Sequence, residues 1–187
     1  QFDDMTNIDK TLRSKLQKVF NISRPSIEKK EISDDGTIKY LFCLEDQSKI
    51  ETVFIPEEKR STLCISSQVG CTLNCSFCHT GTQKLVRNLS SQEIVGQVIA
   101  VYDDLKLWEK KRVNSSHSSC FEIITNIVFM GMGEPLLNYE EVKKACSILM
   151  DNKGLDFSRR RITLSTAGIV PKIKTCLLYT SDAADDT

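Results

Sequence analysis

VGCTLNCSFCH, residues 69–79, places three cysteines at C-x3-C-x2-C spacing: Cys71, Cys75 and Cys78. Thiolates at such spacing suit a soft metal ion or an iron–sulfur cluster. Three thiolates on a four-iron cluster leave one iron free to bind another molecule. The segment therefore predicts a metal centre with an open coordination position, and we expect the chemistry of the protein to take place there.

Two simpler interpretations of these cysteines stay open. One is a structural zinc site completed by His79 or Cys64, and the other is a set of reduced cysteines without a metal. Zinc sites usually combine two C-x2-C pairs, or one such pair with two histidines, and the second pair is missing here. The spacing therefore favours an iron–sulfur cluster.

An amphipathic helix and three short strands are predicted before the cysteine segment. Apolar side chains recur at the helical period in residues 8–20. Residues 27–32, 38–44 and 50–55 have the composition of strands and are separated by turn-forming residues. We expect an antiparallel meander, and residues 1–60 are predicted to form an N-terminal accessory region.

From residue 61 onward, strand-like and helix-like segments alternate. The predicted strands are 62–68, 123–130 and 161–165, and the predicted helices start after Ser90, with a capping box to Glu93, and after Asn138. This order predicts an α/β fold of parallel βα units, with ligands bound at the loops that follow the strands. Three such units are too few for a closed barrel, so the last strand would leave an open edge, and residues 61–174 are predicted to be the front part of a larger domain.

Two further loops follow predicted strands. The first, residues 131–135, contains Gly133, which lets a backbone approach a ligand, and Glu134, whose carboxylate can accept from an amine. The second contains Ser165, whose hydroxyl can hydrogen-bond to a ligand. Each loop alone is no more than a tight turn. Together with the cysteine segment they predict three loops that converge on one rim.

The bulk composition gives no argument for a nucleic-acid or membrane partner. The 25 basic residues equal the 25 acidic ones, so any RNA contact has to come from local patches. The chain opens without a basic region and an apolar run, and it contains no apolar stretch of about 18 residues. We expect a cytoplasmic protein with no membrane partner.

Several separated motifs resemble the RlmN/Cfr family, the radical S-adenosyl-L-methionine (SAM) methyltransferases that modify adenine in RNA. The resemblance is carried by residues 60–71, the cysteine segment with Phe77, residues 87–89, the glycine–glutamate loop and residues 160–166. It implies that residues 61–174 form the first half of an open radical-SAM-type (β/α) barrel. It also implies two cofactors, a 4Fe-4S cluster on the three cysteines and SAM in contact with Gly133, Glu134 and Ser165.

The resemblance also implies a reaction. In the family's mechanism a methyl group passes first to a cysteine in the C-terminal part of the protein and then, through a carbon radical, to the adenine ring. Glu51 matches the family's general base, and Cys64 matches the thiol that resolves the protein–RNA adduct through a disulfide. On local sequence alone, Glu51 resembles a solvated strand carboxylate and Cys64 a buried strand cysteine.

The implied partners are RNA and an electron donor. The resemblance implies methylation of an adenine, at C2, in 23S rRNA, with tRNA as a second substrate, a donor such as flavodoxin, and a monomeric protein. The basic residues expected to contact RNA near the motif loops are Lys84, Arg87, Arg159, Arg160 and Arg161. Alternatives are another radical SAM enzyme with a different substrate and a non-catalytic zinc- or RNA-binding module.

The last residues depart from the family pattern. Residues 175–187 have no family counterpart and resemble translated vector sequence, so we expect a non-native tail. Cys176 does not match the methyl-carrying cysteine in its context, and that cysteine is expected beyond this chain. We therefore expect a truncated chain that is inactive by itself.

Overall fold

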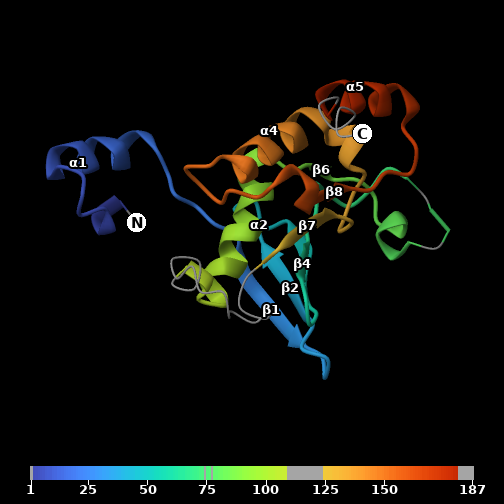
Figure 1. Cartoon of the computed structure of the whole chain (residues 1–187), viewed down its shortest axis with the longest axis horizontal. Helices are drawn as coiled ribbons and strands as arrows, with labels where there is room; N and C mark the ends of the chain where they lie inside the picture. Colours follow the sequence, from blue (N-terminus) through green and yellow to red (C-terminus); the bar gives the residue numbers. More distant parts are fainter. Residues whose placement is uncertain (1, 74, 77, 109–123, 181–187) are drawn as a thin grey trace.

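The computed structural model describes residues 2–73, 75, 76, 78–108 and 124–180. Its centre is a six-stranded mixed sheet in the order β1-β2-β3-β4-β7-β8 (Figure 1). The strands are β1 Ser26–Ile32, β2 Ile38–Cys43, β3 Lys49–Pro56, β4 Ser61–Cys64, β7 Asn126–Phe129 and β8 Ile162–Leu164. Strands β1 to β4 pair antiparallel, and β4, β7 and β8 pair parallel. The predicted meander, the parallel βα units and the α/β class are confirmed, and the sheet runs without interruption across residue 60.

Two helices cover one face of the sheet. These are α2 (Ser91–Asp104) and α4 (Tyr139–Met150), and they also contact each other. Alternate strand residues face them, and all belong to one buried cluster, including Tyr40, Phe42, Ile50, Phe54, Leu63, Ile127 and Phe129. Burying each such side chain contributes roughly 1.5–3 kcal/mol, so this cluster determines which face of the sheet is covered.

The opposite face is only partly covered. It carries Leu41, Glu51, Val53, Cys64 and Val128, each of which is partly exposed. We call these residues the open face. Pairing of Leu41 with Glu51, Val53 with Cys64, and Cys64 with Val128 places them on the same side of neighbouring strands.

The helix starts were predicted with unequal success. Ser90 caps α2 through a complete capping box with Glu93, as predicted. Asn138 precedes α4 but makes no side-chain cap. Its amide instead donates to Ser67 O at 2.8 Å and to Leu89 O at 2.7 Å. Asn138 therefore ties the start of α4 to the segments around the cysteine loop.

The single strand predicted for residues 62–68 is wrong, because β4 ends at Cys64. The backbone of Ser66 instead hydrogen-bonds to the side chain of Gln97 on α2. Ser66 N donates to Gln97 Oε1 at 2.8 Å, and Ser66 O accepts from Gln97 Nε2 at 3.0 Å. The chain then forms β5 (Gln68–Val69), which pairs antiparallel with β6 (Arg87–Asn88). The Gln97 side chain thus takes the place of a neighbouring strand as the hydrogen-bond partner of the Ser66 backbone.

The remaining helical elements lie near the chain ends and in the loops. They are η1 Phe2–Asp4, α1 Lys10–Val19, η2 His79–Thr82, η4 Pro135–Asn138, η5 Arg159–Arg161 and α5 Val170–Thr180. Helix α5 begins before residue 175 and continues into the region expected to be a non-native tail. None of the helices within the described residues is long and apolar enough to cross a membrane.

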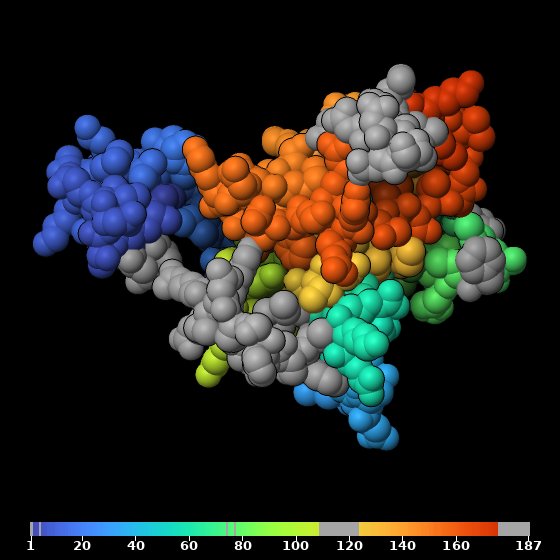
Figure 2. Space-filling view, in the orientation of Figure 1, coloured from blue at the N-terminus to red at the C-terminus, as the bar shows by residue number. Residues whose placement is uncertain are grey.

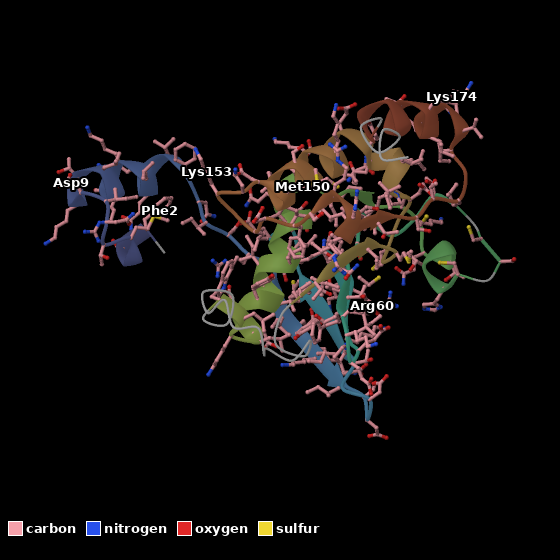
Figure 3. The ribbon with its side chains drawn as sticks, in the orientation of Figure 1. Phe2, Asp9, Arg60, Met150, Lys153 and Lys174 are labelled. Carbon is pink, nitrogen blue, oxygen red and sulfur yellow. The ribbon has the colours of Figure 1, made fainter. Side chains whose placement is uncertain are left out.

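Helix α1 stands away from the sheet as a separate lobe, and none of its residues is buried (Figures 1 and 2). Figure 3 shows Phe2 and Asp9 in this lobe, far from Met150 and Arg60 in the body of the molecule. The lobe begins with a well-formed cap, because the Asp9 carboxylate accepts from Thr11 N at 2.8 Å.

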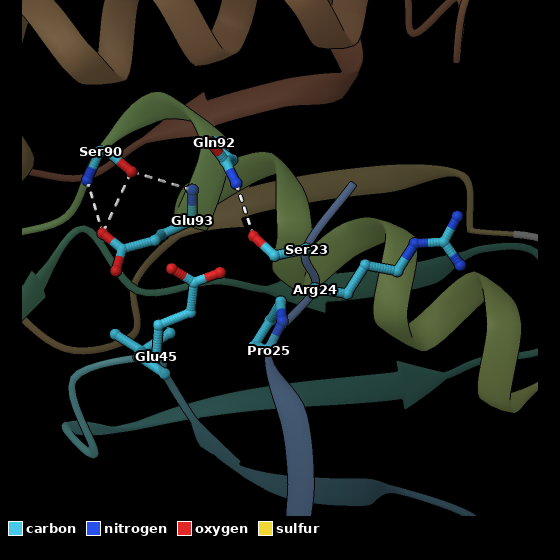
Figure 4. Close-up of a pocket in the computed structure, with 8 residues that line it drawn as sticks. Ser23, Arg24, Pro25, Glu45, Ser90, Gln92 and Glu93 are labelled. Carbon is cyan, nitrogen blue, oxygen red and sulfur yellow. Dashed lines mark hydrogen bonds between the residues drawn. The ribbon is translucent and has the colours of Figure 1, made fainter. Parts of the chain in front are cut away.

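The segment between α1 and β1 is fastened to α2. Gln92 Nε2 donates to Ser23 Oγ at 2.7 Å, beside a small cavity of about 170 Å³ (Figure 4). Arg24 forms an ion pair with Asp103. Pro25 lies so close to α2 that a side chain at Gly96 would meet its Cδ at 2.9 Å. The body of the molecule therefore begins at about Ser23.

Candidate cofactor and active site

The three motif loops start at one edge of the sheet. Cys64 pairs with Val128, and Val128 pairs with Thr163, so β4, β7 and β8 end side by side. The segment to the cysteines, the glycine–glutamate loop and the Ser165 loop leave from these ends. The predicted convergence of the three loops is present in the structure.

Glu134 joins two of these loops. Its side chain is 4% exposed. Oε1 accepts from Leu136 N at 3.0 Å, within its own loop, and Oε2 accepts from Ala167 N at 2.8 Å, in the third loop. A carboxylate has about four lone-pair positions, so both oxygens keep capacity for a further donor such as an amine. Sequence analysis predicted a ligand contact for Glu134, and the structure adds this structural role.

The glycines of the second loop are required by the protein's own packing. Gly133 has φ +92°, and a Cβ there would lie 2.4 Å from Gln68 Cβ. A Cβ at Gly131 would lie 2.7 Å from Ser66 Oγ. Both glycines let the loop approach the segment that follows β4. The predicted approach of Gly133 to a cofactor stays a prediction.

The third loop is attached through its backbone. Ser165 is exposed, directly after β8. Two residues further on, Ala167 donates to Glu134, as described above. Ser165 is therefore held at the sheet edge with its side chain available to a ligand.

The cysteine loop leaves and returns through the β5–β6 pair. Val86 N donates to Val69 O at 2.8 Å, and Cys71 N donates to Gln83 O at 3.3 Å. Gly70 has φ +75°, and a Cβ there would lie 2.2 Å from Lys84 O. Only glycine fits where the two sides of the loop come this close. Beside Cys71 lies an open depression of about 510 Å³.

Cys71, Cys75 and Cys78 are free and partly exposed. Cys78 N donates to Cys75 O at 3.1 Å, so these two residues share one turn of the loop. Among the described residues, no three Cys, His, Asp or Glu side chains lie close enough together to hold a metal ion. In chemical type, three accessible thiols on one loop fit a thiolate-held cluster. These side chains would have to move together to bind it.

Glu51 and Cys64 lie on the open face of adjacent strands. Val53 pairs with Cys64, and Glu51 lies two residues before Val53 on the same side of β3, so Glu51 and Cys64 are diagonal neighbours. The Glu51 carboxylate is paired with Lys39 Nζ at 2.7 Å. Burial raises the pKa of the Cys64 thiol, while a backbone hydrogen bond at Met130 acts in the opposite direction. The structure thus brings together two residues that are thirteen positions apart in sequence.

Arg87 is engaged within the protein. Its guanidinium bonds to Asp46 Oδ2 at 2.7 Å and to both carboxylate oxygens of Glu93, at 2.8 and 2.9 Å. Arg161, which directly precedes β8 at the end of that strand opposite the third loop, donates to Asn126 Oδ1 at 3.2 Å. The predicted RNA contact of Arg87 would require it to leave two carboxylates.

Sequence reasoning missed the polar side chains that connect the loops. They are Ser66, Gln68, Gln97 and Asn138, and each is buried. The one available signal was the presence of polar residues at otherwise apolar positions, because buried polar groups need hydrogen-bond partners. Which partners they would find could not be read from spacing.

Comparison with solved structures gives a radical SAM methyltransferase from Sphaerobacter thermophilus, with a TM-score of 0.81 and 41% identity over 94% of this chain and 48% of that one. No family model matches the sequence. Curated relatives named dual-specificity RNA methyltransferase RlmN are 55% identical in Paracoccus denitrificans and 54% identical in Dinoroseobacter shibae, each over 92% of this chain. Over nearly its whole length, this chain is similar to proteins of the RlmN/Cfr family. It spans 43% of the length of these RlmN relatives.

The structural match extends beyond the cysteine segment. Because it covers 94% of the chain, it includes the meander and the parallel strands, as well as the motif loops. The RlmN/Cfr resemblance seen in separated motifs therefore reflects one shared fold, which is part of a radical-SAM-type barrel.

Proposed function

We propose that the complete protein is a cytoplasmic radical SAM methyltransferase that methylates C2 of an adenine in 23S rRNA and in tRNA, with an electron donor such as flavodoxin. The observation that carries this proposal is the joining of three motif loops at one sheet edge, next to the open face with Glu51 and Cys64. The RlmN relatives and the methyltransferase neighbour support it.

Six residues of this chain are assigned to cofactor binding. Cys71, Cys75 and Cys78 would hold a 4Fe-4S cluster, and Gly133, Glu134 and Ser165 would contact SAM. When bound, these cofactors supply the radical chemistry that activates a methyl group. Glu134, held by two backbone N–H groups, presents a fixed carboxylate to the SAM amine.

Glu51 and Cys64 are assigned to the later steps. Glu51 would remove the ring proton from the RNA adduct, and its partner Lys39 holds the carboxylate on the open face. The Cys64 thiolate would attack the sulfur of the methyl-carrying cysteine and form a disulfide with it. The bond between that sulfur and the carbon attached to the RNA would break, and its electron pair would leave with the RNA product, whose new methyl group takes up a proton. Only the thiolate attacks, and burial raises the pKa of Cys64, so this step requires a nearby base to take the proton.

The test is anaerobic reconstitution of the complete protein, followed by incubation with SAM, reduced flavodoxin and unmodified RNA. Iron and sulfide analysis should give a 4Fe-4S cluster, and mass spectrometry of nucleosides should give 2-methyladenosine. Glu51→Gln and Cys64→Ala should each reduce the product by about 100-fold or more while the cluster content stays the same. Cys43→Ala, a partly exposed cysteine on β2, is the matched control.

Other results would favour the alternatives. SAM cleavage without methylated adenine indicates a radical SAM enzyme with a different substrate, and tightly bound zinc without sulfide indicates a structural module. The present chain, lacking the expected methyl-carrying cysteine, should produce no methylated RNA even with its cluster loaded. Turnover by this chain alone would overturn the assignment of that cysteine.

A further inference from the structure

Gln68 links the base of the cysteine loop to the glycine–glutamate loop. Its side chain is buried, at 1% exposure, although β5 is only two residues long. Oε1 accepts from Glu134 N at 2.8 Å, and Nε2 donates to Asn88 Oδ1, across the β5–β6 pair, at 2.7 Å. The Gln68 amide therefore contacts the glycine–glutamate loop on one side and, on the other, strand β6, through which the cysteine loop returns.

The direction of this link is fixed by chemistry. The backbone N–H of Glu134 can only donate, so the Gln68 atom that faces it must be the carbonyl oxygen. The NH₂ group then points to Asn88, which must present its own oxygen. A single orientation of the two amides satisfies all three groups.

The Gln68 stem is held as firmly as its amide. Gly133 packs against it so closely that an added Cβ would lie 2.4 Å from Gln68 Cβ and 2.6 Å from its Cγ. The Glu134 carboxylate is then bonded to Leu136 N and Ala167 N. A continuous chain of contacts runs from the base of the cysteine loop through Gln68 and Glu134 to the third loop.

We infer that Gln68 is a positioning residue, which holds Glu134 at a fixed place relative to the cysteine loop so that its carboxylate can receive the SAM amine. This inference rests on the proposed function. Without the Gln68 acceptor, the buried N–H of Glu134 would have no partner at that place, and the loop would shift to find one. The Glu134 carboxylate would move with it.

The test compares Gln68→Met with Thr52→Val in the complete, cluster-loaded protein. Methionine has a volume close to that of glutamine but accepts no comparable hydrogen bond. Thr52 is equally buried, and its Oγ1 donates to Gln97 Oε1 at 2.8 Å on the helix-covered side of β3. Thr52→Val therefore removes one buried hydrogen bond without touching Glu134.

The dissociation constant of SAM is measured by equilibrium dialysis, together with iron content and melting temperature. Both variants should melt at lower temperature and keep their iron. Gln68→Met should raise the dissociation constant about tenfold, the order expected for a displaced charged contact, and Thr52→Val should change it less than about twofold. Equal SAM affinity in the two variants would overturn the inference.

A second variant, Gln68→Glu, keeps the inference testable if Gln68→Met does not fold. Glutamate keeps an acceptor for Glu134 N, and the Asn88 amide can rotate to donate to it. It should bind SAM more tightly than Gln68→Met, and binding as weak as that of the methionine variant would also overturn the inference. If the unsubstituted protein itself binds no SAM, the proposed function fails, which is a different result.

Discussion

At the scale of single residues, the two glycines with positive φ in the second and third loops differ in what surrounds them. Gly133 has φ +92° and contacts the Gln68 side chain, whereas Gly168 has φ +104° and nothing within 4 Å of an added Cβ. Alanine at either position has to adopt a left-handed backbone conformation, which lowers the free energy of unfolding by an amount on the order of 1 kcal/mol. Only at Gly133 is a steric clash added.

We therefore expect Gly133→Ala to lower the free energy of unfolding by about 3 kcal/mol or more, and Gly168→Ala by about 1 kcal/mol. Urea unfolding of both variants measures the difference. Equal losses would show that the Gln68 side chain yields without cost, and the close packing between the two loops would then be of no energetic importance.

The Cys64 thiol should react more slowly in the folded chain than in the unfolded one. Burial raises its pKa above the usual value of 9.0, and iodoacetamide attacks only the thiolate. At about pH 8 the folded chain therefore holds less thiolate at this position. Its alkylation rate should continue to rise above pH 9.0, where the rate in the urea-unfolded chain levels off.

Peptide mass spectrometry after timed alkylation, from about pH 7 to pH 10, gives this rate for Cys64 alone. The unfolded chain provides the control for the same thiol. A folded-state rate that levels off at or below the pH seen in urea would contradict the raised pKa, and it would indicate that Cys64 is ready to attack without a base.

The sequence predicted candidate ligand-binding residues, but not the side chains that hold their loops in place. The position of Glu134 and Ser165 at one edge of the sheet could be predicted, because both follow strands that end there. Gln68 could not, because its partners Glu134 and Asn88 lie 66 and 20 residues away. The nearness of Glu51 to Cys64 follows from the register of β3 and β4, which local sequence does not determine.

At the scale of elements, Arg87 on β6 joins the cysteine loop to the meander and to α2. Asp46 belongs to the turn between β2 and β3, and Glu93 is the α2 residue that completes the capping box with Ser90. Burial alone would raise the pKa of Glu93, but the hydrogen bond from Arg87 and its neighbours lower it overall. The same guanidinium holds the pKa of Asp46 well below its usual range.

Arg87→Met should therefore destabilise the protein in a pH-dependent way. A carboxyl with a lowered pKa contributes stability above its unfolded pKa, here 4.5 for Glu93, and loses it as the pH falls through the folded value. Because the group is partly exposed, we expect a loss of roughly 1 kcal/mol at neutral pH that shrinks below about pH 4.

Urea unfolding at several pH values measures this loss. Arg60→Met is the control, because Arg60 forms an exposed pair with Glu57 within one turn of chain and should have little effect. A difference between Arg87→Met and the unsubstituted chain that stays constant from neutral to acid pH would show that Arg87 acts through its packing and not through its charge.

The elements themselves were largely predictable. The capping box at Ser90 and the turns of the meander are local signals, and both were confirmed. The break between β4 and β5 was missed because its cause, the Gln97 side chain, comes from a helix 31 residues further along. The cap expected from Asn138 failed for the same reason, since distant carbonyl groups at Ser67 and Leu89 compete for its amide.

At the scale of the whole molecule, the N-terminal lobe and the body depend on each other very little. Helix α1 has no buried residue, and two of its apolar side chains are exposed, Leu12 at 47% and Val19 at 74%. The body begins where Ser23, Arg24 and Pro25 attach to α2. The burial of apolar surface that stabilises the sheet therefore includes nothing from α1.

Removing residues 1–20 should accordingly change the free energy of unfolding of the body by less than about 0.5 kcal/mol. Removing residues 1–32 also deletes β1, the Arg24–Asp103 pair and the Lys30–Asp104 pair, and it should lower the denaturation midpoint clearly. Urea unfolding followed by the fluorescence of Trp108, beside Tyr102 on α2, reports on the body alone. A large loss of stability from the shorter deletion would show that α1 packs on the body in solution, and the lobe would then have to be counted as part of the fold that positions the site.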